Sequence, residues 1–108
     1  MYYQDTAGRA IKELLPGIGA RTFWGENLML ALVDLAAGAT LPNHAHPHEQ
    51  AGIVLSGELV FIIGGERKLL KAGDLYIIPG GVEHSVQVGA EPAQVLDVFS
   101  PVREEYKY

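Results

Sequence analysis

The feature that most constrains the fold of this chain is a series of short apolar segments separated by Gly and Pro. They span residues 52–55, 58–63, 66–70, 75–78, 84–88 and 93–99. Segments of this length are typical of β-strands, and their regular spacing is typical of a sandwich or a small barrel. Gly64-Gly65, between two of them, is a dipeptide favoured in two-residue hairpin turns. The sequence therefore predicts an all-β fold.

The first third of the chain is less decisive. Residues 21–24 read as a further strand. Residues 28–35 are almost continuously apolar and long enough for either a helix or a strand, so periodicity leaves both open. Near residues 11–15 we expect a helical turn at most.

The composition limits the class of protein. A chain of 108 residues is one domain, residues 1–108, and 48% apolar residues are ample for a core. Eight basic against thirteen acidic side chains give a net charge of −5, which counts against nucleic acid and anionic membranes as partners. The chain has no cysteine, which excludes disulfides and Cys-ligated zinc.

Location and assembly follow from similar considerations. The first residues lack the basic and apolar regions of a signal peptide, and the apolar stretch 28–39 is too short and interrupted to cross a bilayer. We therefore expect a cytoplasmic protein. A domain this small buries only about two-thirds of the surface that its unfolded chain exposes. We therefore expect it to bury further surface by pairing into a homodimer.

Three of the four histidines crowd into residues 44–48. His44 and His46 are two residues apart, so on a strand they share one face, and Gln50 has the same parity. His84 follows the turn at residues 79–81, and pairing of two strands could bring it beside them. Neutral imidazoles are common ligands of transition metals. The alternatives are ordinary surface or hydrogen-bonded histidines, or a four-imidazole set that uses His48, which otherwise reads as a rim residue.

The spacing of these residues resembles the two motifs of the cupin superfamily. The first motif has Gly38, His44, His46, Gln50 and Gly57, with Gln50 in place of the usual Glu. The second has Gly73, Pro79, Gly81 and His84, with Val88 in place of the usual Asn. The resemblance, over residues 38–88, implies a double-stranded β-helix (the jelly-roll barrel), often dimeric. It also implies a divalent transition metal in the barrel mouth, with ligands His44, His46, Gln50 and His84. Because Gln50 is neutral, Ni, Zn, Cu or Fe is favoured over Mn.

The last strand contains a second set of candidate residues. Alternation places Asp97 and Phe99 on one face, which is either the solvated outside or the barrel mouth. Residues 44–50 together with 97–104 resemble the KdgF-type cupins of pectin and alginate breakdown, and residues 27–30 fit the same pattern. That resemblance covers most of residues 20–106. It implies conversion of 4,5-unsaturated monouronates from the cyclic to the linear keto form.

The same resemblance implies that Asp97, Phe99 and Arg103 are the working residues beside the metal. Asp97 would carry a proton, Arg103 would bind the uronate carboxylate, and Phe99 would form an apolar wall. The alternatives are an Asp97–Arg103 ion pair and a Phe99 in the core. Further candidates for the pocket are Arg21, Trp24 and Tyr76, of which the two aromatic residues equally suit the core.

Two other functions fit the same barrel. One is another metal enzyme, such as a dioxygenase whose iron is held by three imidazoles. The other is a cupin that binds an acidic sugar without converting it. In every case the expected partner is a small molecule.

Overall fold

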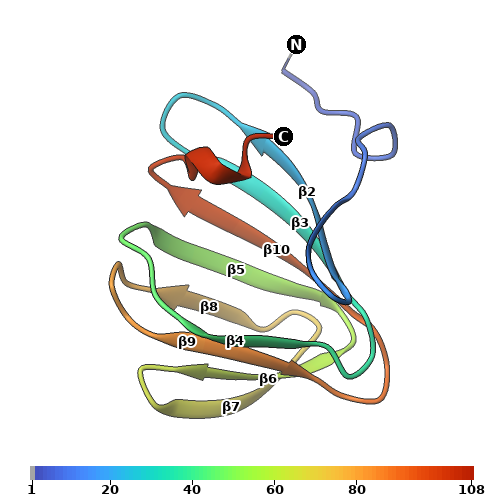
Figure 1. Cartoon of the computed structure of the whole chain (residues 1–108), viewed down its shortest axis with the longest axis vertical. Coiled ribbons are helices and arrows are strands. Elements are labelled where there is room, and N and C mark those ends of the chain that lie inside the picture. The colour runs from blue at the N-terminus through green and yellow to red at the C-terminus, as the bar shows by residue number, and fades with distance from the viewer. Residues whose placement is uncertain (1) are drawn as a thin grey trace.

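The structure, a computed structural model that describes residues 2–108, consists of two antiparallel β-sheets packed face to face (Figure 1). The six-stranded sheet has the order β1-β2-β3-β10-β5-β8, and the four-stranded sheet the order β4-β9-β6-β7. The strands are β1 (Lys12–Leu15), β2 (Ile18–Trp24), β3 (Met29–Leu35), β4 (Thr40–His44), β5 (Glu49–Ser56), β6 (Glu58–Ile63), β7 (Glu66–Lys71), β8 (Leu75–Ile78), β9 (His84–Val88) and β10 (Ala93–Ser100). The prediction of an all-β jelly roll is confirmed.

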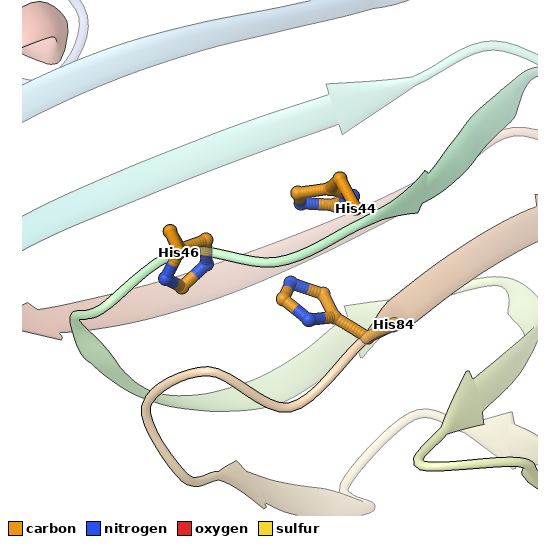
Figure 2. Close-up of side chains that lie close together, drawn as sticks. All are labelled: His44, His46 and His84. Carbon is orange, nitrogen blue, oxygen red and sulfur yellow. The ribbon is translucent and has the colours of Figure 1, made fainter.

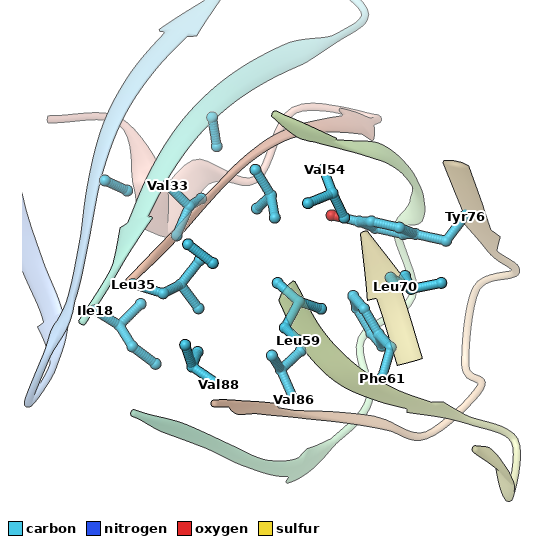
Figure 3. Packing of buried hydrophobic residues seen from close by; sticks show 14 of the residues in the cluster. Ile18, Val33, Leu35, Val54, Leu59, Phe61, Leu70, Tyr76, Val86 and Val88 are labelled. Carbon is cyan, nitrogen blue, oxygen red and sulfur yellow. The ribbon is translucent and has the colours of Figure 1, made fainter. Parts of the chain in front are cut away.

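In the six-stranded sheet, the central strands alternate strictly between buried and less buried side chains. In β3 every second residue from Met29 to Leu35 is buried, and β10 alternates in the same way from Ala93 to Phe99. Alternation with period two is a strand property, and β3 is hydrogen-bonded on both sides, to β2 and β10. Of residues 28–35, whose state periodicity leaves open, residues 29–35 are therefore a strand. The inward side chains of both sheets form the core (Figure 3).

The predicted turns also form. Strands β6 and β7 pair with Ile63 opposite Glu66, so Gly64-Gly65 is the two-residue turn between them. The motif glycines at 38, 57, 73 and 81 all have φ between 72° and 93°, in the left-handed region that favours glycine. These glycines therefore connect strands, as the sequence predicts.

Near residues 11–15, where the sequence allows a helical turn at most, the chain is extended. Residues Lys12–Leu15 form β1 instead and pair with β2. An open edge of β2 supplies backbone partners for an extended segment, and this outweighs a weak local preference for a turn. Within residues 2–108 the one helical element is the 3₁₀ turn η1 (Glu104–Tyr106), and no helix in that range is long and apolar enough to cross a membrane.

Candidate metal centre and its cavity

Three imidazoles converge at one end of the barrel (Figure 2). His44 ends β4 and lies opposite His84, the first residue of β9, while His46 lies in the loop between β4 and β5. One nitrogen from each of the three rings lies within 4.8 Å of the others. Strand pairing between β4 and β9 therefore joins the two sequence motifs into one group.

The backbone sets the orientation and tautomer of each ring. The Nδ1 atoms lie 2.9 Å from the carbonyl oxygen of Pro42 for His44, 3.1 Å from that of His48 for His46, and 2.9 Å from that of Val82 for His84. A carbonyl oxygen only accepts, so each Nδ1 carries the proton and donates it. Each Nε2 then keeps a free lone pair, as in metal-binding histidines held by a backbone carbonyl.

Two further observations fit a cation among these rings. Nε2 of His84 is buried and has no hydrogen-bond partner among residues 2–108. Burial is the largest cause that lowers the pKa of both His46 and His84, and the nearby charge of Arg103 lowers both further. The rings of His46 and His84 are therefore neutral near pH 7, which is the state that coordinates a metal. His44, His46 and His84 form a group that could hold a metal ion, and these donors suit a transition metal.

Gln50 lies beside this group. Its side chain is buried, and its Oε1 lies 3.0 Å from Nε2 of His46. The amide of Gln50 also lowers the pKa of Asp97, which fits an orientation with its NH₂ end toward that carboxyl group, because only this end can donate to a carboxylate. Two acceptor atoms, Oε1 and Nε2, then face each other, an arrangement that a shared cation satisfies.

His48 is not part of the three-imidazole group. Its ring centroid lies 5.6 Å from that of His46, and its backbone carbonyl accepts the Nδ1 proton of His46. His48 therefore supports a candidate ligand through its backbone.

Asp97 points into the barrel, which decides between the two faces left open by the sequence. Its side chain is buried and accepts a 2.5 Å hydrogen bond from the hydroxyl of Tyr76. Burial raises the pKa of Asp97 to about 6, although hydrogen bonds from Tyr76 and Gln50 and the charge of Arg103 act in the opposite direction. Burial and the neighbouring Asp97 also raise the pKa of Tyr76, which keeps its proton.

Arg103 lies at the rim with its guanidinium over two aromatic rings. The distance to the ring centroid is 4.0 Å for Tyr106 and 5.0 Å for Phe99. Its Nε lies 3.4 Å from a carboxylate oxygen of Glu105. An ion pair between Asp97 and Arg103 is not among the ion pairs of residues 2–108, so that alternative does not describe this site.

A cavity of about 500 Å³ connects these groups. The site residues that line it are His44, Gln50, Tyr76, His84, Asp97, Phe99 and Arg103. Its deeper walls are apolar and include Val33, Leu59 and Val86. The arrangement combines a candidate cation site, a buried carboxyl group and a rim guanidinium within one hollow.

The pocket candidates from the sequence divide into two groups. Tyr76 lines the cavity, whereas Arg21 lies outside it and binds the carbonyl of Thr6 and the carboxylate of Asp34. Trp24, which is 38% exposed, does not line the cavity either.

The sequence reasoning missed Tyr106 and Tyr108, which line the mouth. Thr22 donates to the carbonyl of Tyr106 at 2.6 Å and so ties this terminal segment to β2. No spacing in the sequence signals that contact.

Comparisons with known proteins agree with this geometry. A family profile described as a cupin domain matches residues 31–99. The pectin degradation protein KdgF of Dickeya dadantii (strain 3937) is 34% identical over 97 residues, which cover 88% of each chain. The structure of KdgF from a Halomonas species superposes with a TM-score of 0.88 at 27% identity, covering 94% of both chains. An RmlC-like cupin from Shewanella frigidimarina NCIMB 400 gives a TM-score of 0.92 at 27% identity, covering 98% of this chain and 96% of the other.

Proposed function

The chain belongs to the cupin family and is a relative of KdgF, and from this premise we propose that it converts 4,5-unsaturated monouronates from the cyclic to the linear keto form. The observation that carries the proposal is a cavity lined by the Asp97 carboxyl group, the Arg103 guanidinium and two imidazoles, His44 and His84, of the three-imidazole group. A sugar acid formed by a pectin or alginate lyase offers a carboxylate and several oxygens to such a site.

We propose His44, His46, His84 and Gln50 as the ligands of a divalent transition metal. Imidazole nitrogen and amide oxygen are uncharged ligand types, and the orientation of each ring is set by a backbone carbonyl. When bound, the cation supplies Lewis-acid stabilisation of negative charge that develops on substrate oxygen. Ni, Zn, Cu and Fe are the candidates that imidazole-rich sites prefer, with Mn less favoured.

Arg103 is proposed to bind the uronate carboxylate. Its planar guanidinium matches the two oxygens of a carboxylate, and stacking on Tyr106 limits its freedom before the substrate arrives. Glu105 occupies one donor, Nε, so the remaining donors are available to the substrate. Phe99, next to Arg103 and 5.8 Å from the ring of His46 between centroids, would supply an apolar wall.

Asp97 is proposed to carry the proton. Ring opening and ketonisation move protons between oxygen and carbon atoms of the substrate without net gain or loss, so no oxidant is required. A carboxyl group with a pKa raised to about 6 can both accept and return a proton near neutral pH. The buried position of Asp97 also limits exchange of that proton with solvent.

The test follows the conjugated alkene absorbance of a monouronate freshly made by a lyase. We expect metal-loaded protein to speed the loss of absorbance over the spontaneous rate, and a chelator to remove the effect. Asp97→Asn and Arg103→Ala should each reduce the enzymatic rate by at least about 100-fold, as expected for loss of a proton carrier or a substrate clamp.

The control variant is Glu26→Gln, in the exposed turn between β2 and β3, which should retain the wild-type rate. Binding of the uronate without any spectral change would contradict conversion and favour a sugar-binding cupin. Oxygen consumption by an iron-loaded sample would favour a dioxygenase instead.

We further propose that the protein acts as a single domain, as a homodimer, and in the cytoplasm. Two large apolar side chains on the edge strand β8 support the dimer, because Leu75 is 72% and Ile77 is 69% exposed. Exposed apolar side chains beside an unpaired strand edge favour association with another chain.

A further inference from the structure

Three residues lie in one row across three neighbouring strands. Asp97 of β10 pairs with Gly52 of β5, and Gly52 pairs with Tyr76 of β8. Neighbouring strands are about 4.8 Å apart, so the backbones of Tyr76 and Asp97 are separated by roughly 10 Å. Two side chains can meet across that distance only if the residue between them leaves the space free.

Gly52 leaves that space free. A Cβ atom at this position would overlap the ring and the hydroxyl of Tyr76. Glycine inside a strand has no side chain to pack and weakens the strand. Where it occurs, it often marks a place that another group approaches closely. Here the approaching group is the phenol of Tyr76, which lies across β5.

The phenol ends on the carboxyl group of Asp97. Its hydroxyl donates to Oδ1 at 2.5 Å, and the neighbouring amide of Gln50 lowers the pKa of the same carboxyl group. The ring of Tyr76 packs on Phe61, with centroids 4.6 Å apart, which restricts its movement. The hydrogen bond from Tyr76, which lies on a different strand, thus determines how the carboxyl group is turned.

We propose that Tyr76, whose ring lies over Gly52, is a positioning residue. Its hydrogen bond holds the carboxyl group of Asp97 in the orientation needed for proton transfer in the cavity. The inference rests on the proposed function, because it assigns Tyr76 a role through the proposed proton carrier. If Tyr76 only filled the core, phenylalanine would serve equally well, since the ring and its contact with Phe61 would remain.

The first experiment is the variant Tyr76→Phe. We expect kcat to fall at least about tenfold with KM changed by less than about twofold, because substrate binding through Arg103 is left intact while Asp97 loses the hydrogen bond that orients it. On an Asp97→Asn background the same change should cause no further loss, since Tyr76 acts through Asp97. Wild-type kcat in Tyr76→Phe, or an equal additional loss on the Asp97→Asn background, would overturn the proposal.

A second variant tests the same hydrogen bond by displacing the ring of Tyr76 rather than removing its hydroxyl. Gly52→Ala places a methyl group where the phenol lies, so a folded Gly52→Ala protein should show the same kcat loss as Tyr76→Phe. Gly25→Ala is the matched control, because a Cβ there meets no atom of residues 2–108 within 4 Å, and it should keep wild-type kcat. A folded Gly52→Ala protein with wild-type kcat would count against the role of Gly52.

A spectroscopic measurement separates this inference from the proposed function. In zinc-loaded protein, the buried hydroxyl proton of Tyr76 should give a slowly exchanging, downfield proton NMR resonance that is absent in Tyr76→Phe and shifted in Asp97→Asn. If the wild type fails to accelerate uronate conversion, the proposed function fails and this resonance alone decides the placement of Asp97. Its absence in the wild type would overturn the placement.

Discussion

At the scale of the residue, the site depends on side chains held in unusual surroundings. Asp97 is a carboxyl group inside an apolar barrel, and His46 and His84 are imidazoles that burial keeps neutral. Their types and positions were readable from the sequence. Their surroundings were not, because burial of Asp97 depends on side chains from β5, β8 and β10 together.

The raised pKa of Asp97 makes the stability of the metal-free protein depend on pH. Its pKa is 3.8 in the unfolded chain and about 6 in the fold, so the fold favours the protonated form and loses stability as pH rises through that window. One pKa unit is worth about 1.4 kcal/mol, so the cost reaches about 3 kcal/mol by pH 7.

Asp97→Asn cannot ionise and should escape this cost. We expect the unfolding free energy of wild type minus that of Asp97→Asn to fall by about 3 kcal/mol between pH 3.5 and 7, measured by urea unfolding after chelation. The difference between wild type and Glu26→Gln should lack this fall. A pH-independent difference for Asp97→Asn would show that the fold leaves the pKa of this carboxyl group at its unfolded value.

At the scale of the element, pairing with neighbouring strands determined the secondary structure of segments whose local sequence pattern was ambiguous. Residues 12–15 form β1 because β2 offers an unpaired edge, and residues 29–35 form β3 because β2 and β10 lie on both sides. On the opposite edge of the same sheet, β8 exposes Leu75 and Ile77. That edge is where we expect the second subunit.

This expectation predicts the effect of a charge on β8. Wild-type protein should sediment with twice the mass of one chain, and Ile77→Lys should sediment as a monomer because a buried unpaired charge disfavours the interface. The control is Leu69→Lys on β7, the edge strand of the other sheet. The side chain of Leu69 is 48% exposed, and this variant should sediment like the wild type. A monomeric wild type, or a dimeric Ile77→Lys, would argue against an interface at β8.

At the scale of the whole molecule, the candidate metal site joins the two sheets. His44 and His84 come from the four-stranded sheet, and Gln50 comes from β5 of the six-stranded sheet. A cation bound by all of them would link the sheets at the barrel mouth, in the native state only. Metal binding should therefore add to the free energy of unfolding.

We expect zinc at about 100 times its Kd to stabilise the wild type by about 2.7 kcal/mol, seen as a higher Tm, and His84→Ala to lose most of that gain. Protons compete for the imidazoles. Because the pKa values of His46 and His84 lie below 6.5, the gain should persist to a pH below 6.5 before it disappears. An equal Tm increase in His84→Ala would mean that the zinc binds elsewhere.

The sequence by itself determined the all-β class, the turn positions and the candidate ligands, because these depend on alternation, glycine conformation and spacing along one chain. It left open the state of residues 29–35, the face on which Asp97 lies, and the place of Tyr76. Only the tertiary structure decided these. They depend on strand register: pairing of β8, β5 and β10 places Tyr76, Gly52 and Asp97 in one row. Strand register brings together residues that are far apart in the chain, and the hydropathy pattern within one strand does not specify it.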